Sequence, residues 1–319
     1  MNTVLITGGT GLIGTALTKA LLEKNYRVII LTRNKNKITP PSSANLSYAE
    51  WNIEEQTIDA SAVTKSDYII HLAGAGIADK RWTSKRKKEI VESRTQSSSL
   101  LVKALKENSN NVKAVISASG IGWYGSNTPN SSPQGGEGER ATAFTEVDPA
   151  AEDFLGETCK EWEASIDPVM SLGRRLIKFR TGIVLSNEGG ALKEFKKPLQ
   201  FGIAAILGNG KQVMSWIHID DLVRLYIYAM ENEKLQGVYN AVAPQTITNK
   251  KFTLQLARSI RGRFFVPIFV PSFILEIVLG EMSIEVLKSA TVSCEKIKSN
   301  GFTFIHPSVT SAIHKLEAS

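Results

Sequence analysis

The chain has 319 residues and a net charge of +7, with 42% hydrophobic and 22% charged residues. These values are typical of a globular protein long enough to bury a large core. Its two cysteines exclude a disulfide framework and a cysteine metal site, and they fit a reducing cytoplasm. The sequence contains no evident signal peptide, membrane span or nucleic-acid-binding module. We therefore expect a cytoplasmic protein without metal, membrane or nucleic-acid partners.

A glycine-rich turn near the N-terminus joins a predicted strand to a predicted helix. Residues 4–7 are an apolar run typical of a buried strand, and the spacing of Leu17, Ala20 and Leu21 is helical. Between them, residues 8–14 read GGTGLIG, where backbone amides at a helix N-terminus can approach a pyrophosphate. A turn without a ligand is the alternative, but the strand–turn–helix context favours a dinucleotide site. The residues expected to bind are Gly8, Thr10, Gly11, Leu12, Ile13 and Gly14.

Further strands alternate with helices along the chain. This order predicts right-handed crossovers and a doubly wound α/β Rossmann fold, with a parallel sheet covered on both faces. We expect a cofactor domain over 1–185, to which 216–245 can return, and a smaller C-terminal substrate-side lobe over 186–319. The predicted strands are Arg27–Leu31, Tyr68–Leu72, Val112–Ser117 and Phe179–Leu185, and the predicted long helix is Thr83–Lys106.

Two polar segments each leave two interpretations open. The Gly- and Ser-rich stretch Ser126–Arg140 follows a predicted strand, so it is either a lid over a ligand or a surface excursion. The basic cluster comprises Lys80, Arg81 and the run from Lys85 to Lys88. A solvated helix face is the favoured interpretation of this cluster, and attraction of an anionic cofactor is the alternative.

The end of the second predicted strand indicates which nicotinamide cofactor binds. NAD sites usually place an acidic residue there to bind the ribose 2′-hydroxyl. This chain instead has Thr32 and Arg33, and a guanidinium can bind a 2′-phosphate through paired N–H donors. We therefore predict NADP(H), with an exposed basic turn as the alternative.

Motifs along most of the chain resemble one known family. They include the glycine turn, the segment His71–Gly74, the segment Ser117–Ser119 followed by Trp123–Gly125, and the late segment Trp216–Asp221. Together they resemble the extended short-chain dehydrogenase/reductases of the NAD(P)-dependent epimerase/dehydratase family. Further segments resemble a poorly characterised "epimerase family protein" subgroup, some members of which carry a cell-division-inhibitor label. These segments include Arg81-Trp82, Trp162-Glu163, Arg180-Thr181-Gly182 and Gly280-Glu281-Met282.

The resemblance implies a set of cofactor contacts. It implies that Thr32 and Arg33 hold the adenosine phosphate and that Ser119 lies at the usual serine position. It also places Glu89 and Arg94 near the cofactor, although their spacing alone would suggest an ordinary surface pair on a helix. The cofactor-lining residues after the fourth strand are Leu72, Ala73 and Gly74.

The family's catalytic Tyr-x-x-x-Lys pattern is absent. Leu155 and Cys159 occupy the tyrosine and lysine positions, and neither can transfer the proton or supply the positive charge. Ser119 and Tyr124 are the catalytic candidates that remain, with a structural hydroxyl and a packing role as their alternatives. Cys159 and His218 are more typical of a small buried hydrophobe and a structural histidine.

The expected substrate site also departs from the family pattern. Met214 stands where many sugar-nucleotide enzymes have an arginine, and a thioether cannot bind a diphosphate. Trp123, Tyr124 and Trp216 suggest an aromatic-walled pocket, with core packing as the alternative. We therefore predict an NADP(H)-binding epimerase or oxidoreductase-like protein acting on an unknown small molecule. The alternative is a catalytically inactive NADP(H)-sensing regulator linked to cell division, and a homodimer is the assembly that we consider.

Overall fold

The computed structural model describes residues 1–34, 43–127 and 143–318. Its centre is an eight-stranded sheet in the order β12-β7-β6-β5-β1-β2-β3-β4. The strands are parallel except β4, which is antiparallel to β3. This arrangement confirms the predicted doubly wound α/β fold. The bounds are β1 (Thr3–Thr7), β2 (Arg27–Thr32), β3 (Leu46–Asn52), β4 (Thr57–Ile58), β5 (Tyr68–His71), β6 (Ala114–Gly120), β7 (Arg175–Thr181) and β12 (Gly237–Ala241).

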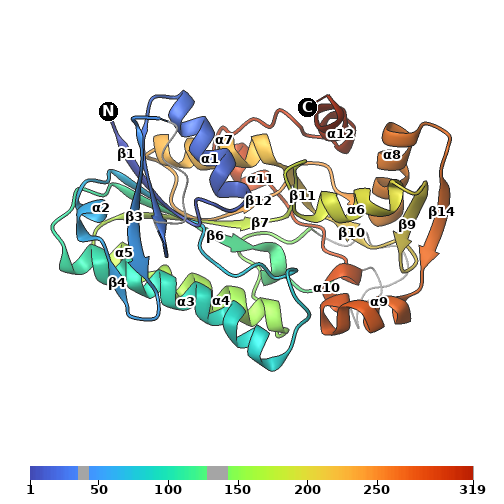
Figure 1. The fold of residues 1–319 in the computed structure, drawn as a ribbon, viewed down its shortest axis with the longest axis horizontal. Helices are drawn as coiled ribbons and strands as arrows, with labels where there is room; N and C mark the ends of the chain where they lie inside the picture. The colour runs from blue at the N-terminus through green and yellow to red at the C-terminus, as the bar shows by residue number, and fades with distance from the viewer. Residues whose placement is uncertain (35–42, 128–142, 319) are drawn as a thin grey trace.

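Helices cover both faces of this sheet because successive side chains of each strand point to opposite sides (Figure 1). In β1, Val4 and Ile6 join one apolar cluster and Leu5 joins another. The first cluster includes residues of α1 and α7, and the second includes residues of α2 to α5. The bounds are α1 (Leu12–Glu23), α2 (Ala60–Thr64), α3 (Ser84–Glu107), α4 (Phe154–Ile166), α5 (Pro168–Ser171) and α7 (Ile219–Glu231).

The prediction of a single strand over Phe179–Leu185 is wrong, because the chain breaks at Gly182. There β7 ends, and β8 (Ile183–Leu185) pairs instead with β11 (Trp216–His218) outside the large sheet. A Cβ on Gly182 would lie 2.7 Å from the carbonyl oxygen of Ser215. Glycine therefore allows the two backbones to approach where the chain passes from the sheet to the C-terminal lobe.

The segment after β11 lies with the sheet. Helix α7 packs against α1, and β12 pairs in parallel with β7 at the sheet edge. The proposed division of the chain at residue 185 stays a prediction.

The C-terminal lobe lies at one end of the molecule and has an apolar core of its own (Figure 1). Phe252 and Leu256 of α8 pack in this core with Leu192 of α6. No helix within the described ranges is both long and apolar enough to cross a bilayer. The remaining elements are η2 (Ile121–Trp123), α6 (Ala191–Leu199), β9 (Ile203–Leu207), β10 (Val213–Met214), β13 (Ile247–Thr248), α8 (Asn249–Arg261), β14 (Val266–Val270), α9 (Ser272–Leu279), η3 (Gly280–Met282), α10 (Ser283–Leu287), α11 (Glu295–Ser299) and α12 (Val309–Glu317).

Candidate cofactor and active site

The glycine turn joins β1 to α1 at the carboxyl end of the central strand. Gly8 has φ +67°, and a Cβ there would lie 2.9 Å from the carbonyl carbon of Leu72. A Cβ on Gly14 would meet the backbone of Gly8 and Gly9. Gly11 caps α1 without a side chain. The amides of residues 12–14 therefore have no hydrogen-bond acceptor among the described residues. At the N-terminus of a helix, such free amides can bind an anion.

Buried hydrogen bonds hold the segment after β5 against this turn. The Thr7 hydroxyl accepts the N–H groups of Leu72 and Ala73, each at 3.1 Å, and lies 2.7 Å from Nδ1 of His71. Nε2 of His71 lies 3.0 Å from the Ser98 hydroxyl on α3. Burial lowers the pKa of His71 to about 3, so the ring is neutral. The predicted cofactor-lining residues Leu72 to Gly74 are thus fixed beside Gly8.

Thr32 and Arg33 lie at the carboxyl end of β2, next to β1 in the sheet. The Arg33 side chain is exposed, and the Thr32 hydroxyl accepts the Asn34 N–H at 3.3 Å. No acidic residue follows β2 up to residue 34, where this described range ends. The structure therefore places a guanidinium at the strand end, on the same edge of the sheet as the glycine turn.

The basic cluster is not entirely a solvated face, and that interpretation is wrong for Arg86. Its side chain is buried, and Nη1 lies 2.8 Å from the Glu89 carboxylate. This ion pair lowers the pKa of the exposed Glu89. The surface-pair interpretation is wrong for Arg94, which is buried on the same helix.

Arg94 is a buried cation beside Gly74. Its Cζ lies 4.9 Å from the Trp162 ring centroid, and a Cβ on Gly74 would lie 3.1 Å from this Cζ. Its Nη1 donates to the carbonyl oxygen of Ile90, but no carboxylate in the described part of the chain pairs with it. Burial accordingly lowers the pKa of Arg94.

The two positions of the absent Tyr-x-x-x-Lys pair are buried on α4. Leu155 packs against Gly122, and the Cys159 thiol lies 3.6 Å from the carbonyl oxygen of Gly120. Burial raises the pKa of Cys159 to about 11, so the thiol is neutral. This face of α4 supplies neither the proton nor the positive charge that the family pattern provides.

Ser119 belongs to a buried polar network that the sequence did not predict. Its hydroxyl donates to Oε1 of Glu163 at 2.8 Å, and the same carboxylate forms a two-pronged ion pair with Arg180. The side chains of Glu163 and Arg180 are 5% and 3% exposed, so this pair is enclosed. While the Ser119 proton is held by Glu163, the serine oxygen can accept a hydrogen bond but cannot donate one.

Tyr124 continues this network into the core. Its hydroxyl donates to Oδ1 of Asn240 at 2.7 Å and accepts Nη1 of Arg180 at 3.1 Å. The residue is 0% exposed, and burial raises its pKa to about 12. Its hydroxyl therefore has a donor and an acceptor inside the protein. Catalytic roles for Tyr124 and Ser119 stay predictions.

Two of the three aromatic residues expected around a substrate lie in the core. Tyr124 and Trp216 are 0% and 1% exposed, so the expectation of an aromatic-walled pocket is wrong for them. Trp123 is partly exposed, and the Arg180 guanidinium stacks 3.5 Å from its ring centroid. Met214 is buried near the Asn249 amide. The lid interpretation falls largely on residues 128–142, which lie outside the described residues.

His218 is a buried N-cap of α7 and lies beside a second histidine. Its Nδ1 accepts the Asp220 N–H at 3.1 Å, and its ring centroid lies 4.1 Å from that of His306. Burial, together with His306, lowers the pKa of His218 to about 4. Its main visible role is therefore to begin the helix.

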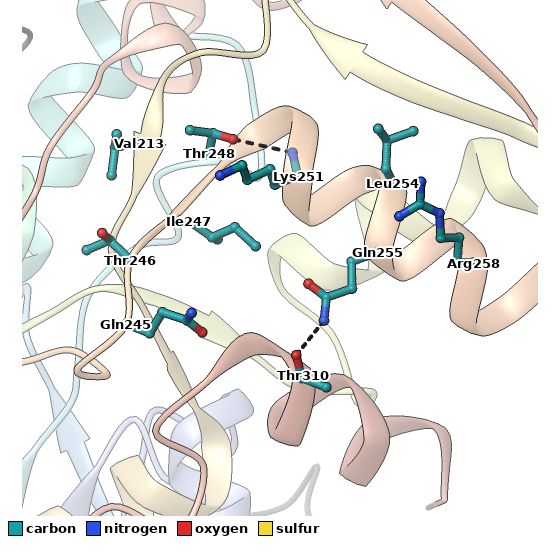
Figure 2. Close-up of a pocket in the computed structure, with 10 residues that line it drawn as sticks. All are labelled: Val213, Gln245, Thr246, Ile247, Thr248, Lys251, Leu254, Gln255, Arg258 and Thr310. Carbon is teal, nitrogen blue, oxygen red and sulfur yellow. Dashed lines mark hydrogen bonds between the residues drawn. The ribbon is translucent and has the colours of Figure 1, made fainter.

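A cavity of about 430 Å³ opens elsewhere, in the C-terminal lobe (Figure 2). It lies among β10, β13, α8 and α12, and Gln255 donates across it to the Thr310 hydroxyl at 2.8 Å. None of the predicted site residues lines it, so it is distinct from the glycine turn. The lining residues are Val213, Gln245, Thr246, Ile247, Thr248, Lys251, Leu254, Gln255, Arg258 and Thr310.

Comparisons with known proteins agree with this geometry. Residues 4–150 and 195–241 match the model of the NAD dependent epimerase/dehydratase family, and residues 270–316 match a domain of unknown function, DUF1731. Epimerase family protein SSP1921 of Staphylococcus saprophyticus is 33% identical, over 99% of both chains. Epimerase family protein ML0860 of Mycobacterium leprae is also 33% identical, over 97% of this chain and 94% of its own.

Among solved structures, the human epimerase family protein SDR39U1 (isoform 2), determined with NADPH, superimposes with a TM-score of 0.82. It is 27% identical, and the match covers 99% of each chain. The family model spans more than half of the sequence, and the curated relatives match it from end to end. The chain therefore belongs to the NAD dependent epimerase/dehydratase family.

Proposed function

We propose that the protein binds NADP(H) and acts as an epimerase or oxidoreductase-like enzyme on a small molecule. One observation carries the proposal: the free amides at the start of α1 and the Arg33 guanidinium share one edge of the sheet. The first group suits a pyrophosphate, and the second suits a 2′-phosphate. The human relative determined with NADPH supports this choice of cofactor.

The glycine positions fit a dinucleotide because side chains there would occupy the space beside the turn where its pyrophosphate would bind. Gly8 and Gly14 leave room only for backbone, so the pyrophosphate would be bound by the amides of residues 12–14. Thr32 and Arg33 would hold the adenosine phosphate. Arg94, a buried cation without a carboxylate partner in the described residues, supplies positive charge beside Gly74.

The nicotinamide would supply hydride exchange when bound. The chain's own residues then orient the substrate and handle a proton. Because Leu155 and Cys159 offer no acid or base, we propose that Ser119 makes the polar contact at the reacting end of the nicotinamide. Its hydroxyl is committed to Glu163, so we propose that Ser119 accepts a hydrogen bond and that a water molecule provides the proton.

Titration with NADPH and NADH tests the cofactor. We expect NADPH to bind more tightly than NADH. Arg33→Ala should weaken the affinity for NADPH by about tenfold to a hundredfold and leave the affinity for NADH unchanged, because charge-assisted hydrogen bonds contribute about 1.5–3 kcal/mol. Arg27→Ala is the matched control, since Arg27 is exposed at the opposite end of β2. Equal loss for both cofactors, or none, would contradict the role of Arg33.

A panel of small carbonyl compounds followed by NADPH absorbance tests catalysis. We expect turnover on at least one compound class, and we expect Ser119→Ala to lower kcat by about tenfold or more at saturating NADPH, since positioned polar groups contribute at this scale. Tyr124→Phe should change stability rather than kcat. Absence of turnover across the panel, with intact NADPH binding, would favour the NADP(H)-sensing alternative.

A further inference from the structure

Positive charge is concentrated in one segment of the C-terminal lobe. Residues 234–275 contain six Lys and Arg residues and no Asp or Glu, whereas the net charge of the whole chain is +7. Five of the six lie on or directly after α8, at positions 250, 251, 258, 261 and 263. On α6, by contrast, Lys196 forms an ion pair with Glu317 at 2.8 Å. The segment around α8 therefore carries an excess of positive charge that it does not itself neutralise.

Two of these cations line the cavity in the C-terminal lobe. Lys251 and Arg258 are about two turns apart on α8, so they lie on one face of the helix together with Leu254 and Gln255 (Figure 2). Neither cation forms an ion pair within the described ranges, and no carboxylate from these ranges lines the cavity. The wall of the cavity thus presents positive charge without a counter-charge.

The other polar groups of the cavity add hydrogen-bond donors. The Thr310 hydroxyl accepts Nε2 of Gln255 at 2.8 Å, so its own proton is left to donate. Oε1 of Gln245 accepts the Val309 N–H at 3.1 Å, and the N–H groups of the Gln245 amide have no acceptor in the described part of the chain. Cations and N–H or O–H donors around one space are complementary to an oxyanion.

The size of the cavity and its apolar residues indicate an organic ligand. Val213, Ile247 and Leu254 contribute apolar surface to the lining. The volume of about 430 Å³ lies in the range of about 300–1,000 Å³ that is usual for small-molecule sites. Nucleic acids, by comparison, bind to basic stripes or grooves that follow their backbone. The hollow shape therefore favours a small molecule that carries both an oxyanion and an apolar body.

The cavity lies on the far side of β10 from the position that binds diphosphates in many sugar-nucleotide enzymes. That position is occupied by Met214, which is buried beside the Asn249 amide. Its neighbour Val213 lines the cavity instead. Successive residues of a strand point to opposite sides, so the cavity and position 214 are on different sides of β10.

We propose that this cavity binds a small organic oxyanion, either a phosphate ester or a carboxylate, at a site independent of the nicotinamide cofactor. Lys251 and Arg258 bind the anionic oxygens, and the apolar lining contacts the organic body. The opposite face of α8 packs in the lobe core through Phe252 and Leu256. This packing holds the two cations on a rigid element before the ligand binds.

Calorimetric titration of the full chain tests the site, with phenyl phosphate, benzoate and inorganic phosphate as probes. We expect at least one of the two organic probes to bind with a Kd below about 1 mM, and the tighter of them distinguishes a phosphate ester from a carboxylate. Inorganic phosphate should bind at least about tenfold more weakly, because it has no apolar body. The Kd should be the same with and without saturating NADPH. Absence of binding by both organic probes at about 10 mM, or loss of binding when NADPH is added, would overturn the proposal.

Variants of equal charge separate the cavity from the general positive field. Lys251→Gln/Arg258→Gln should raise the Kd of the tighter probe by about tenfold or more, because it removes charge-assisted hydrogen bonds. Lys250→Gln/Arg263→Gln removes the same charge outside the cavity and should raise this Kd by less than about threefold. All four residues are exposed, so both variants should keep wild-type circular dichroism. Equal losses in the two variants would overturn the proposal.

Protection from acetylation locates the bound probe. Lys250 and Lys251 are neighbours, and both are exposed to a reagent such as sulfosuccinimidyl acetate, but only Lys251 lines the cavity. The tighter probe should therefore slow acetylation of Lys251 and leave that of Lys250 unchanged, as peptide mass spectrometry would measure. Equal protection of both lysines, or of neither, would contradict the site. Tight binding of single-stranded DNA that Lys251→Gln/Arg258→Gln abolishes would overturn the proposal by assigning these cations to nucleic acid.

Discussion

His71 is a buried residue whose neutral form stabilises the segment beside the glycine turn. Its folded pKa of about 3 lies below the unfolded value of 6.5, so the unfolded chain binds the proton first as pH falls. Stability is therefore fully present above pH 6.5 and is lost progressively towards pH 3. We expect His71 alone to lower the free energy of unfolding by about 2 kcal/mol between pH 7 and pH 5.

Urea denaturation at pH 7 and pH 5 measures this loss. His71→Gln should be less stable than wild type at pH 7 because the Thr7–His71–Ser98 bonds are broken, but its loss towards pH 5 should be smaller by about 2 kcal/mol. The pKa of His218 is lowered to about 4, so His218 should still make the unfolding free energy of this variant depend on pH. His314→Gln is the control, since His314 is exposed on α12. If the stability of His71→Gln depended on pH as steeply as that of wild type, His71 would not be the group responsible for the loss.

Glu163 neutralises Arg180 inside the protein, and this ion pair should contribute more to stability than the Ser119 hydrogen bond does. Removing the Ser119 hydroxyl leaves Glu163 with both guanidinium bonds, so Ser119→Ala should cost only about 1 kcal/mol of stability. Glu163→Gln leaves a buried cation without its counter-charge and should cost about 3–5 kcal/mol. Chemical denaturation of the two variants measures the difference. Equal costs would mean that the charge pair does not dominate this network.

At the scale of elements, the β1–turn–α1 unit depends on the absence of side chains at particular positions. A Cβ on Gly14 would meet the backbone of Gly8 and Gly9, which cannot move without opening the turn. Gly14→Ala should therefore lower stability by about 1–3 kcal/mol and abolish measurable NADPH binding. Gly11→Ala is the in-turn comparison, because its nearest atom would lie at 3.3 Å and its φ is −81°. It should cost less stability than Gly14→Ala, as thermal denaturation would show.

The predictable elements are those whose pattern is local. β1, β2 and β5 coincide with apolar runs, and the helix predicted over 83–106 is observed as Ser84–Glu107. The hydrophobic periodicity that identifies a strand or a helix can be recognised within a few consecutive residues. The break at Gly182 cannot be predicted from the local sequence, because it depends on the Ser215 carbonyl, which is a neighbour only in the folded chain.

The parts of the site that the sequence did not predict depend on contacts between distant segments. Glu163 and Arg180 stood in segments that supported the family resemblance, but nothing in their spacing pairs them. Tyr124 and Asn240 lie 116 positions apart, and they meet only because β6 and β12 both flank β7. Arg94 resembled a surface residue because helical spacing does not reveal which side packs against α4.

At the scale of the whole molecule, the net charge of +7 attracts any anionic dinucleotide, whereas Arg33 should distinguish one from another. Salt separates these two effects. Raising the ionic strength screens the general field, so it should weaken the binding of both cofactors, and that of NADPH somewhat more because of its additional phosphate. The contact between Arg33 and the 2′-phosphate is exposed and should be screened in addition, so NADPH should weaken more steeply. The Kd of NADH divided by the Kd of NADPH, measured by titration at several salt concentrations, should thus fall with salt more steeply in wild type than in Arg33→Ala. A ratio that falls equally in both proteins would assign the preference to the surrounding charge rather than to Arg33.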